Sequence, residues 1–150
     1  MFGLFKKKKK ELPPFETLKN SDTKDKYFIR LARWDWLDQN MIHVVDNHAP
    51  RMITMDPWPQ LVFLEANGQR TIHEFVYEMA SQYSAKETVP EELDKTILEI
   101  IQSLVDDKLI ALTNKKQSLA YYLDQPTSQQ NKEKAEKAML EDGFINKSIL

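Results

Sequence analysis

The chain has 150 residues, of which 41% are hydrophobic and 29% charged, a composition typical of one globular domain with tails. It contains no cysteine, which excludes disulfides, thiolate metal sites and cysteine nucleophiles, and a reducing cytoplasm is the expected location. The net charge of −2 is unevenly spread: residues 1–40 carry 10 basic and 6 acidic groups, whereas residues 41–112 carry 5 and 12.

The N-terminal segment places apolar residues ahead of a run of lysines. This is the reverse of signal-peptide order, and the apolar part is too short for a signal peptide. One interpretation of Met1 to Lys10 is a weak membrane-surface contact, and the alternative is a solvated tail. Because Pro13-Pro14 and many polar residues follow, we predict that residues 1–26 form a basic, disordered leader and linker.

Three stretches have the composition of β-strands. Residues 27–36 are aromatic-rich, and residues 41–45 and 51–55 are β-branched and apolar. The turn formers of residues 46–50 predict that the last two strands pair as a hairpin. Trp34 and Trp36 share a parity and should face one side of their strand, either as core cover or as a stacking platform.

Three helices are expected next. Asp56 is the expected N-cap of a short helix that Pro57-Trp58-Pro59 opens and that stops at Gly68. Thr71 and Glu74 form a capping box, so a second helix should start there and end near Tyr83.

A second capping box, Thr88-Val89-Pro90-Glu91, predicts the start of a longer helix that runs to about Lys108. One face of this helix is apolar, through Leu93, Ile97, Ile100, Ile101, Leu104 and Val105. The apolar run of residues 109–112 after it predicts a short strand.

Beyond residue 112 the pattern weakens. Residues 118–123 suit a short helix, and residues 128–142 favour a helix with a thin apolar stripe that Gly143 would close. Such a helix either docks on the domain, docks on a second copy through Leu119, Tyr122 and Met139, or frays, and residues 144 and 145 are expected to dangle beyond it.

Together these elements predict an α+β, winged-helix-like domain over residues 27–112. It should contain a small N-terminal antiparallel sheet of about three strands, three helices and a short C-terminal strand. Residues 113–150 are then a partly helical extension with a marginal C-terminal helix.

The same residues resemble the PqqD-like family over roughly residues 41–112. The resemblance is carried by a strand ending in Met55-Asp56, by Ala66-Asn67-Gly68-Gln69-Arg70-Thr71-Ile72, by Val89-Pro90-Glu91-Glu92-Leu93, and by residues 104–110. Lys108 departs from the family pattern, which usually has glycine there, and so does Pro57-Trp58-Pro59, where the family has small residues.

The resemblance implies a non-enzymatic peptide-binding module that serves enzymes which modify ribosomally made peptides. Family members bind a leader or precursor peptide as an added β-strand and present it to the modifying enzyme. Carried over by position, the implied peptide-binding residues are Arg51, Met52, Ile53, Thr54 and Met55 on the strand, with Leu93, Ile97 and Ile101 on the facing helix. Each of these helix residues could instead be simply core, since an apolar stripe is usually buried.

Two other classes of function remain open. A winged helix could bind nucleic acid or act as a regulator, but the would-be recognition helix, residues 91–108, carries six acidic side chains against two lysines and would repel phosphates. A structural homodimer or interaction scaffold is the other alternative.

An enzyme is not expected. The sequence has no phosphate-binding loop, no GxGxxG, no GxSxG and no HExxH motif. His43, His48 and His73 are not at metal-ligand spacing, so we predict no metal and no cofactor.

Overall fold

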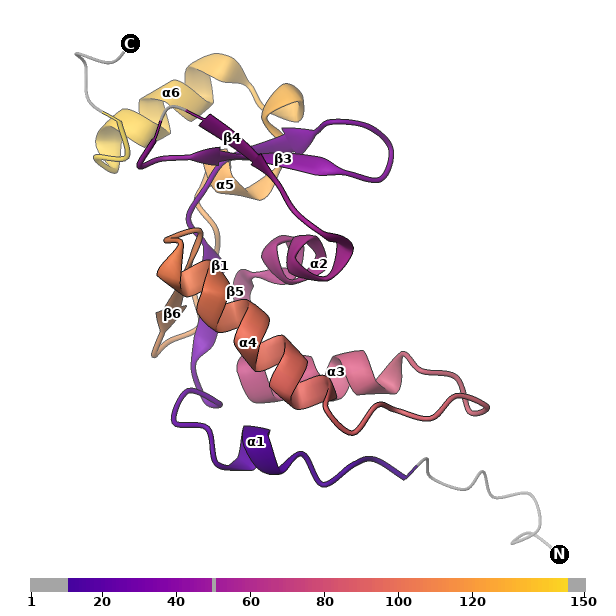
Figure 1. Ribbon diagram of the computed structural model, residues 1–150. Coiled ribbons are helices and arrows are strands. Elements are labelled where there is room, and N and C mark those ends of the chain that lie inside the picture. Colours follow the sequence, from indigo (N-terminus) through magenta and orange to yellow (C-terminus); the bar gives the residue numbers. More distant parts are fainter. Residues whose placement is uncertain (1–10, 50, 146–150) are drawn as a thin grey trace, which may run out of the picture.

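The structure, a computed structural model, describes residues 11–49 and 51–145 (Figure 1). Over these residues the chain is α+β, with two three-stranded antiparallel sheets and six helices. The strands are β1 (Tyr27–Arg30), β2 (Trp34–Trp36), β3 (Ile42–Asp46), β4 (Arg51–Thr54), β5 (Asn67–Thr71) and β6 (Ile110–Thr113). The helices are α1 (Glu16–Lys19), α2 (Pro57–Glu65), α3 (Ile72–Ser81), α4 (Leu93–Asp106), α5 (Tyr121–Asp124) and α6 (Lys132–Glu141), and a 3₁₀ turn, η2, spans Thr127–Gln129.

None of the helices described has the length and apolar composition needed to cross a bilayer. The membrane-contact interpretation of Met1 to Lys10 lies outside the described residues.

The stretch expected as one strand over residues 27–36 forms two strands in different sheets. β1 lies between β5 and β6, whereas β2 pairs with β3, which pairs with β4. At the crossing, the Leu31 N–H donates to the Leu109 carbonyl at 2.8 Å, and the Arg33 carbonyl accepts from the Val45 N–H at 2.9 Å. The prediction of a single strand was wrong because the residues between Arg30 and Trp34 carry the chain from one sheet to the other.

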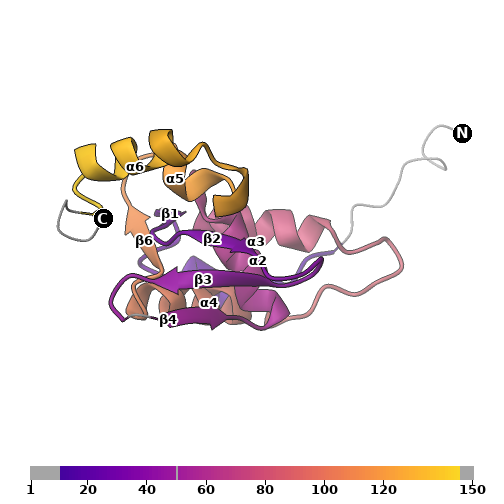
Figure 2. The ribbon, with the colours of Figure 1, turned by 90° about the horizontal axis from the view of Figure 1, so that it is seen from above.

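The hairpin predicted from residues 41–55 is confirmed. β3 and β4 pair antiparallel, with His43 opposite Thr54 and Val44 opposite Ile53. Figure 2 shows β2, β3 and β4 side by side, with α5 and α6 beyond β2.

The strand β5 was not predicted from the sequence. At Gly68, within this strand, only the end of a helix was expected. Gly68 has φ +76°, and a Cβ there would lie 2.3 Å from the Gln117 carbonyl oxygen. The Gln117 N–H donates to the Gly68 carbonyl at 3.0 Å. Only glycine allows this approach, which brings the C-terminal extension against β5.

Of the two capping boxes predicted, only the first forms. The Glu74 N–H donates to Oγ1 of Thr71 at 3.1 Å, and the Thr71 N–H donates to Oε1 of Glu74 at 3.0 Å. α4 instead begins at Leu93, without a side-chain cap. The second box was a wrong prediction: Val89 is buried in the core, and the chain ahead of Leu93 turns rather than winding into the helix.

The segment predicted as a disordered linker is partly folded onto the domain. Phe15 and Leu18 are almost completely buried beside α4, and the Phe15 ring meets the Tyr77 ring edge to face at 5.4 Å. The proline and polar content suggested a linker, but these two apolar side chains extend the core. Within the described residues, that expectation is corrected for residues 15–18.

The C-terminal extension docks on the domain. The buried guanidinium of Arg30 donates to the carbonyls of Leu64, Leu123 and Asp124 at 2.8 to 2.9 Å. Burial lowers the pKa of Arg30 from its usual value, against the raising effect of Asp124. The domain therefore holds α5 through the charged side chain of Arg30 on β1.

The extension also has its own small core. Tyr122, Leu123, Ala135 and Met139 are buried together between α5 and α6. Phe144, expected to dangle, stacks at a tilt on the Tyr122 ring with centroids 4.8 Å apart. That expectation fails because the chain folds back after Gly143, whose φ is +71°.

Candidate functional site

β4 forms one outer edge of the β2-β3-β4 sheet and is its most exposed strand. In β3, alternate side chains are buried. In β4, Ile53 is half-buried and the other three side chains are exposed. Met52 is 62% exposed, the largest value among the exposed large hydrophobic residues described. A hydrophobic edge strand of this kind is a natural site for pairing with another strand.

The register shows which backbone groups of β4 face the open edge. The Val45 N–H donates to Arg33, so the backbone groups of Val45 point toward β2 and away from β4. Alternation in an antiparallel pair then makes Val44 and Ile53 a hydrogen-bonded pair. The N–H and C=O groups of Met52 and Thr54 consequently point outward, and no backbone group within residues 11–49 and 51–145 bonds to them on that side.

The opposite edge of the same sheet is closed. The Trp34 carbonyl accepts from Oγ1 of Thr127 at 3.1 Å, and the Trp36 N–H donates to Oδ1 of Asp35 at 2.8 Å. Asp35 in turn accepts from both the N–H and the hydroxyl of Ser128 at 2.9 Å. The 3₁₀ turn η2 therefore covers β2, and β4 is the edge left for a partner.

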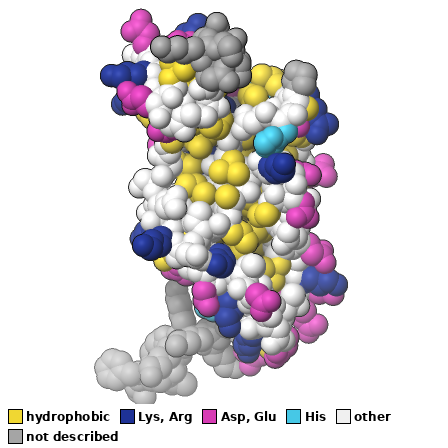
Figure 3. Space-filling model, turned by 90° about the vertical axis from the view of Figure 1, so that its left-hand side faces the viewer, with side chains coloured by type: hydrophobic (Ala, Val, Ile, Leu, Met, Phe, Trp, Pro, Cys, Tyr) yellow, Lys and Arg dark blue, Asp and Glu magenta, His cyan; other side chains and the backbone are white. Residues whose placement is uncertain are grey.

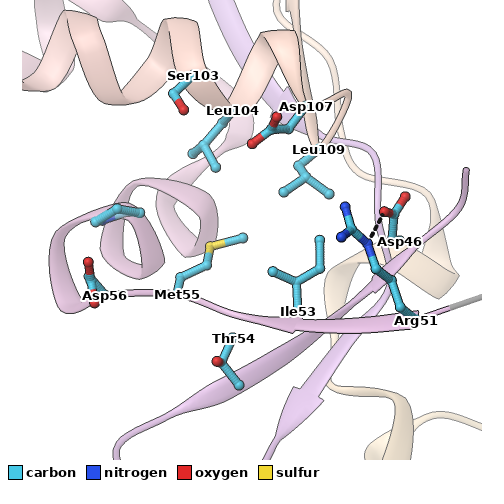
Figure 4. A pocket seen from close by; sticks show the side chains of 11 residues that line it. Asp46, Arg51, Ile53, Thr54, Met55, Asp56, Ser103, Leu104, Asp107 and Leu109 are labelled. Atoms are coloured by element: carbon cyan, nitrogen blue, oxygen red, sulfur yellow. Dashed lines mark hydrogen bonds and ion pairs between the residues drawn. The ribbon is translucent and has the colours of Figure 1, made fainter. Parts of the chain in front are cut away.

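A cavity of about 310 Å³ lies between β4 and the C-terminal end of α4. Figure 4 shows Ile53, Met55, Leu104 and Leu109 pointing into it from both sides, whereas Thr54 points away. Its full lining is Asp46, Arg51, Ile53, Thr54, Met55, Asp56, Pro59, Ser103, Leu104, Asp107 and Leu109. An open strand edge thus borders an apolar floor.

One end of this cavity holds an ion pair. Nε of Arg51 donates to Oδ2 of Asp46 at 2.8 Å, and the His48 N–H donates to Oδ1 of the same carboxylate at 2.9 Å. The Arg51 hydrogen bond, followed by the His48 backbone bond, lowers the pKa of Asp46 from its usual value. The ion pair holds the first residue of β4 against the last residue of β3, and Asp46 neutralises the charge of Arg51.

A second hollow continues the cavity along α4. It is lined by Pro59, Thr96, Glu99, Ile100, Ser103 and Leu104, three of which also line the first. On the face seen from the left of Figure 1, hydrophobic side chains form a band down the middle of the molecule, with charged groups mostly at its margins (Figure 3).

The structure brings together the strand residues that the sequence singled out. Arg51, Ile53, Thr54 and Met55 line the cavity, and Met52 lies beside them on the exposed edge. The helix residues singled out lie elsewhere: Leu93, Ile97 and Ile101 are at most 3% exposed and belong to the central core.

The helix side chains that do line the cavity, Ser103, Leu104 and Asp107, were not proposed as site residues. Leu104 was placed on the apolar stripe, and Ser103 and Asp107 sit one turn apart on the flank of that stripe. Helical spacing could have suggested Ser103 and Asp107, because residues that flank the apolar face of a helix remain accessible to a partner.

Metal-binding geometry is not found in the described part of the chain. No group of three or more His, Asp or Glu side chains there is arranged to hold a metal ion.

Trp34 and Trp36 meet edge to face at 5.6 Å, but Trp34 is buried and Trp36 is 43% exposed. The two rings therefore differ: Trp34 belongs to the core, whereas Trp36 lies at the surface. Neither the prediction of core cover nor that of a stacking platform fits both.

Comparison of the chain with protein-family models, with curated proteins and with solved structures returned no match.

Proposed function

We propose that this chain is a non-enzymatic, PqqD-like module that captures a leader or partner peptide as a β-strand added to β4 and presents it to a modifying enzyme. The observation that supports this most directly is the open β4 edge, lying beside an apolar cavity that α4 completes. An incoming extended peptide would bond to the outward groups of Met52 and Thr54, and its alternate side chains would enter the cavity.

The order of elements supports the proposed winged-helix-like arrangement. α2, β5, α3, α4 and β6 follow one another along the chain, and the helices α3 and α4 pack against each other. The β2-β3-β4 sheet stands apart from β5, β1 and β6 as a separate platform (Figures 1 and 2). We assign peptide capture to that platform and to the face of α4 turned toward it.

Capture of this kind requires no catalytic side chain. The affinity would come from main-chain hydrogen bonds and apolar burial, and the specificity from the side chains that enter the cavity. The covered β2 edge restricts strand addition to the β4 side of the sheet, so the bound peptide would lie beside β4 and α4.

Duplex DNA is the weaker alternative for this surface. Along α4, Glu99, Asp106 and Asp107 are exposed, and phosphate neutralisation supplies most of the affinity of DNA-binding proteins. We expect no specific duplex binding at physiological salt.

Proline substitution in β4 tests the proposal. Peptides selected from a displayed random library on the full chain serve as the probe, and binding is measured by fluorescence anisotropy. Thr54→Pro removes an outward N–H donor, so binding should fall at least tenfold while the thermal transition is nearly unchanged. Ile53→Pro removes a donor directed at β3 and should lower the stability of the fold.

A chemical change in the probe provides a control that leaves the protein untouched. N-methylation of alternate peptide amides should abolish binding for one set of positions and spare it for the other, because only alternate groups face β4. Equal binding by both sets, together with normal binding to a folded Thr54→Pro chain, would place the interaction surface away from β4.

A further inference from the structure

We propose that the peptide captured by β4 carries two basic side chains four residues apart, with an apolar side chain midway between them. This inference rests on the proposed function and specifies the chemistry of its ligand. It is argued from the acidic side chains along α4, the apolar floor, and the spacing of a β-strand.

The α4 side of the groove repeats at one-turn intervals. Glu99, Ser103 and Asp107 lie four residues apart and line the two adjoining hollows. From Glu99 to Asp107 the helix rises about 12 Å. In an extended peptide, side chains on one face that are four residues apart are separated by about 13 Å. Two side chains of one peptide face can therefore meet the two carboxylates together.

Apart from Ser103, the lining between the two carboxylates is apolar, because Ile100 and Leu104 lie on α4 between Glu99 and Asp107. Ile53 points into the cavity from β4, and Leu109, just ahead of β6, points into it beside Asp107 (Figure 4). The peptide side chain midway between the two basic ones would lie over this floor. An apolar residue there removes hydrocarbon from water on both partners, whereas a charged one would be desolvated without a partner.

The charges of the groove favour a cationic peptide. Arg51, the only basic residue among the described residues that line the two hollows, is bonded to Asp46. Across residues 11–49 and 51–145, Asp56, Glu99 and Asp107 form no ion pair. A peptide with acidic residues at the same two positions would meet like charges.

The position of Asp107 at the end of α4 also supports a basic ligand. It is the C-cap of α4, where the helix dipole is negative and an acidic side chain is unfavourable for the helix. Its carboxylate therefore opposes local stability while adding negative potential to the cavity mouth. The basic–x–apolar–x–basic pattern reads the same in both directions, so it applies to parallel and antiparallel strand addition alike.

Three synthetic peptides of equal length test the pattern against the ¹⁵N-labelled full chain. The first is Gly-Thr-Lys-Thr-Leu-Thr-Lys-Thr-Gly, and the second replaces both lysines with glutamate. The third, Gly-Thr-Thr-Lys-Leu-Lys-Thr-Thr-Gly, has the composition of the first, but its lysines lie on the opposite face from its leucine. Titrations follow the amide signals of Met52 and Thr54.

We expect the first peptide to bind at least fivefold more tightly than either control, and its advantage to shrink at 1 M salt, where charges are screened within about 3 Å. Glu99→Gln and Asp107→Asn should each weaken it roughly two- to fivefold, as for exposed ion pairs. Asp106→Asn is the matched control, since Asp106 accepts from Gln102 and lines neither hollow.

The outcomes separate this inference from the proposed function. If all three peptides shift the Met52 and Thr54 signals with equal affinity, strand capture stands and the charge pattern is wrong. If no peptide shifts those signals, both proposals fail. A chain that is dimeric without peptide, with those two amides already protected, would identify a second copy as the occupant and overturn the inference.

Discussion

The backbone N–H of Leu18 donates a 2.9 Å hydrogen bond to Oδ2 of Asp94, 76 positions further along the chain. Asp94 is only 2% exposed and lies in the first turn of α4, where a carboxylate also interacts favourably with the helix dipole. Leu18 itself is completely buried. This bond joins the N-terminal segment to the helix that completes the candidate site.

Replacing Asp94 should measure the strength of that attachment. Asp94→Ala leaves a buried N–H without its acceptor, and we expect the free energy of unfolding to fall by about 1.5–3 kcal/mol in urea titrations. Asp94→Asn retains an acceptor oxygen and should lose less. Lys95→Ala, at an exposed neighbouring position, should change stability by less than about 0.5 kcal/mol. An unchanged midpoint for Asp94→Ala would contradict this account.

The core side of α4 should be distinguishable from its groove side. Ile97 is completely buried, so Ile97→Ala should cost about 2–5 kcal/mol. Ile100 is only half-buried and should cost less, and Thr96→Ala, on the exposed side, serves as the control. Calorimetry on the three variants checks the order, and a larger loss at Ile100 than at Ile97 would show that the helix face is wrongly placed.

Lys108 is a candidate for stabilisation. It has φ +60°, and the Leu109 N–H beyond it donates to the Leu104 carbonyl at 2.9 Å, so α4 ends in a left-handed turn that favours glycine. Lys108→Gly removes the strain of a left-handed side-chain residue, and we expect a gain of about 0.5–1 kcal/mol after the entropy of glycine in the unfolded chain is included.

Lys108→Ala removes the lysine charge but retains a Cβ, so it should not stabilise the protein. Equal effects of the alanine and glycine substitutions on the thermal midpoint would attribute the change to charge instead of backbone conformation.

High pH should loosen the C-terminal extension. Burial, together with the 2.9 Å hydrogen bond from Oη of Tyr122 to Oδ2 of Asp142, raises the pKa of Tyr122 to about 12. A tyrosine in the unfolded chain ionises near pH 10. Because the folded pKa is the higher one, this stabilisation is fully present below about pH 10 and is lost as the pH rises toward 12.

Phenolate absorbance during a pH titration measures the Tyr122 value by difference from Tyr122→Phe. Urea midpoints above pH 10 should fall more steeply for the natural chain than for that variant. Parallel curves would show that the Tyr122 hydroxyl does not contribute to the pH dependence.

Local sequence signals identified several elements because their physical cause is local. The Thr71 and Glu74 capping box needs only side chains and backbone of one helical turn, and the β3–β4 hairpin follows from apolar strands around a turn-forming stretch. The strand part of the candidate site, residues 51–55, was accessible for the same reason. Helical periodicity likewise placed Ile97 and Ile101 on a buried face.

What only the tertiary structure decided involves groups far apart in the chain. The division of residues 27–36 between two sheets depends on partners near residues 45 and 109, and the burial of Leu18 depends on Asp94. The C-terminal extension covers the β2 edge of the sheet through η2, so that β4 is the accessible edge. Leu104 and Asp107 line the cavity, and Leu93 does not, because the C-terminal end of α4 is the part that lies opposite β4 (Figure 4). No periodicity in a single segment contains that information, because packing between distant segments determines which edge and which helix face remain accessible.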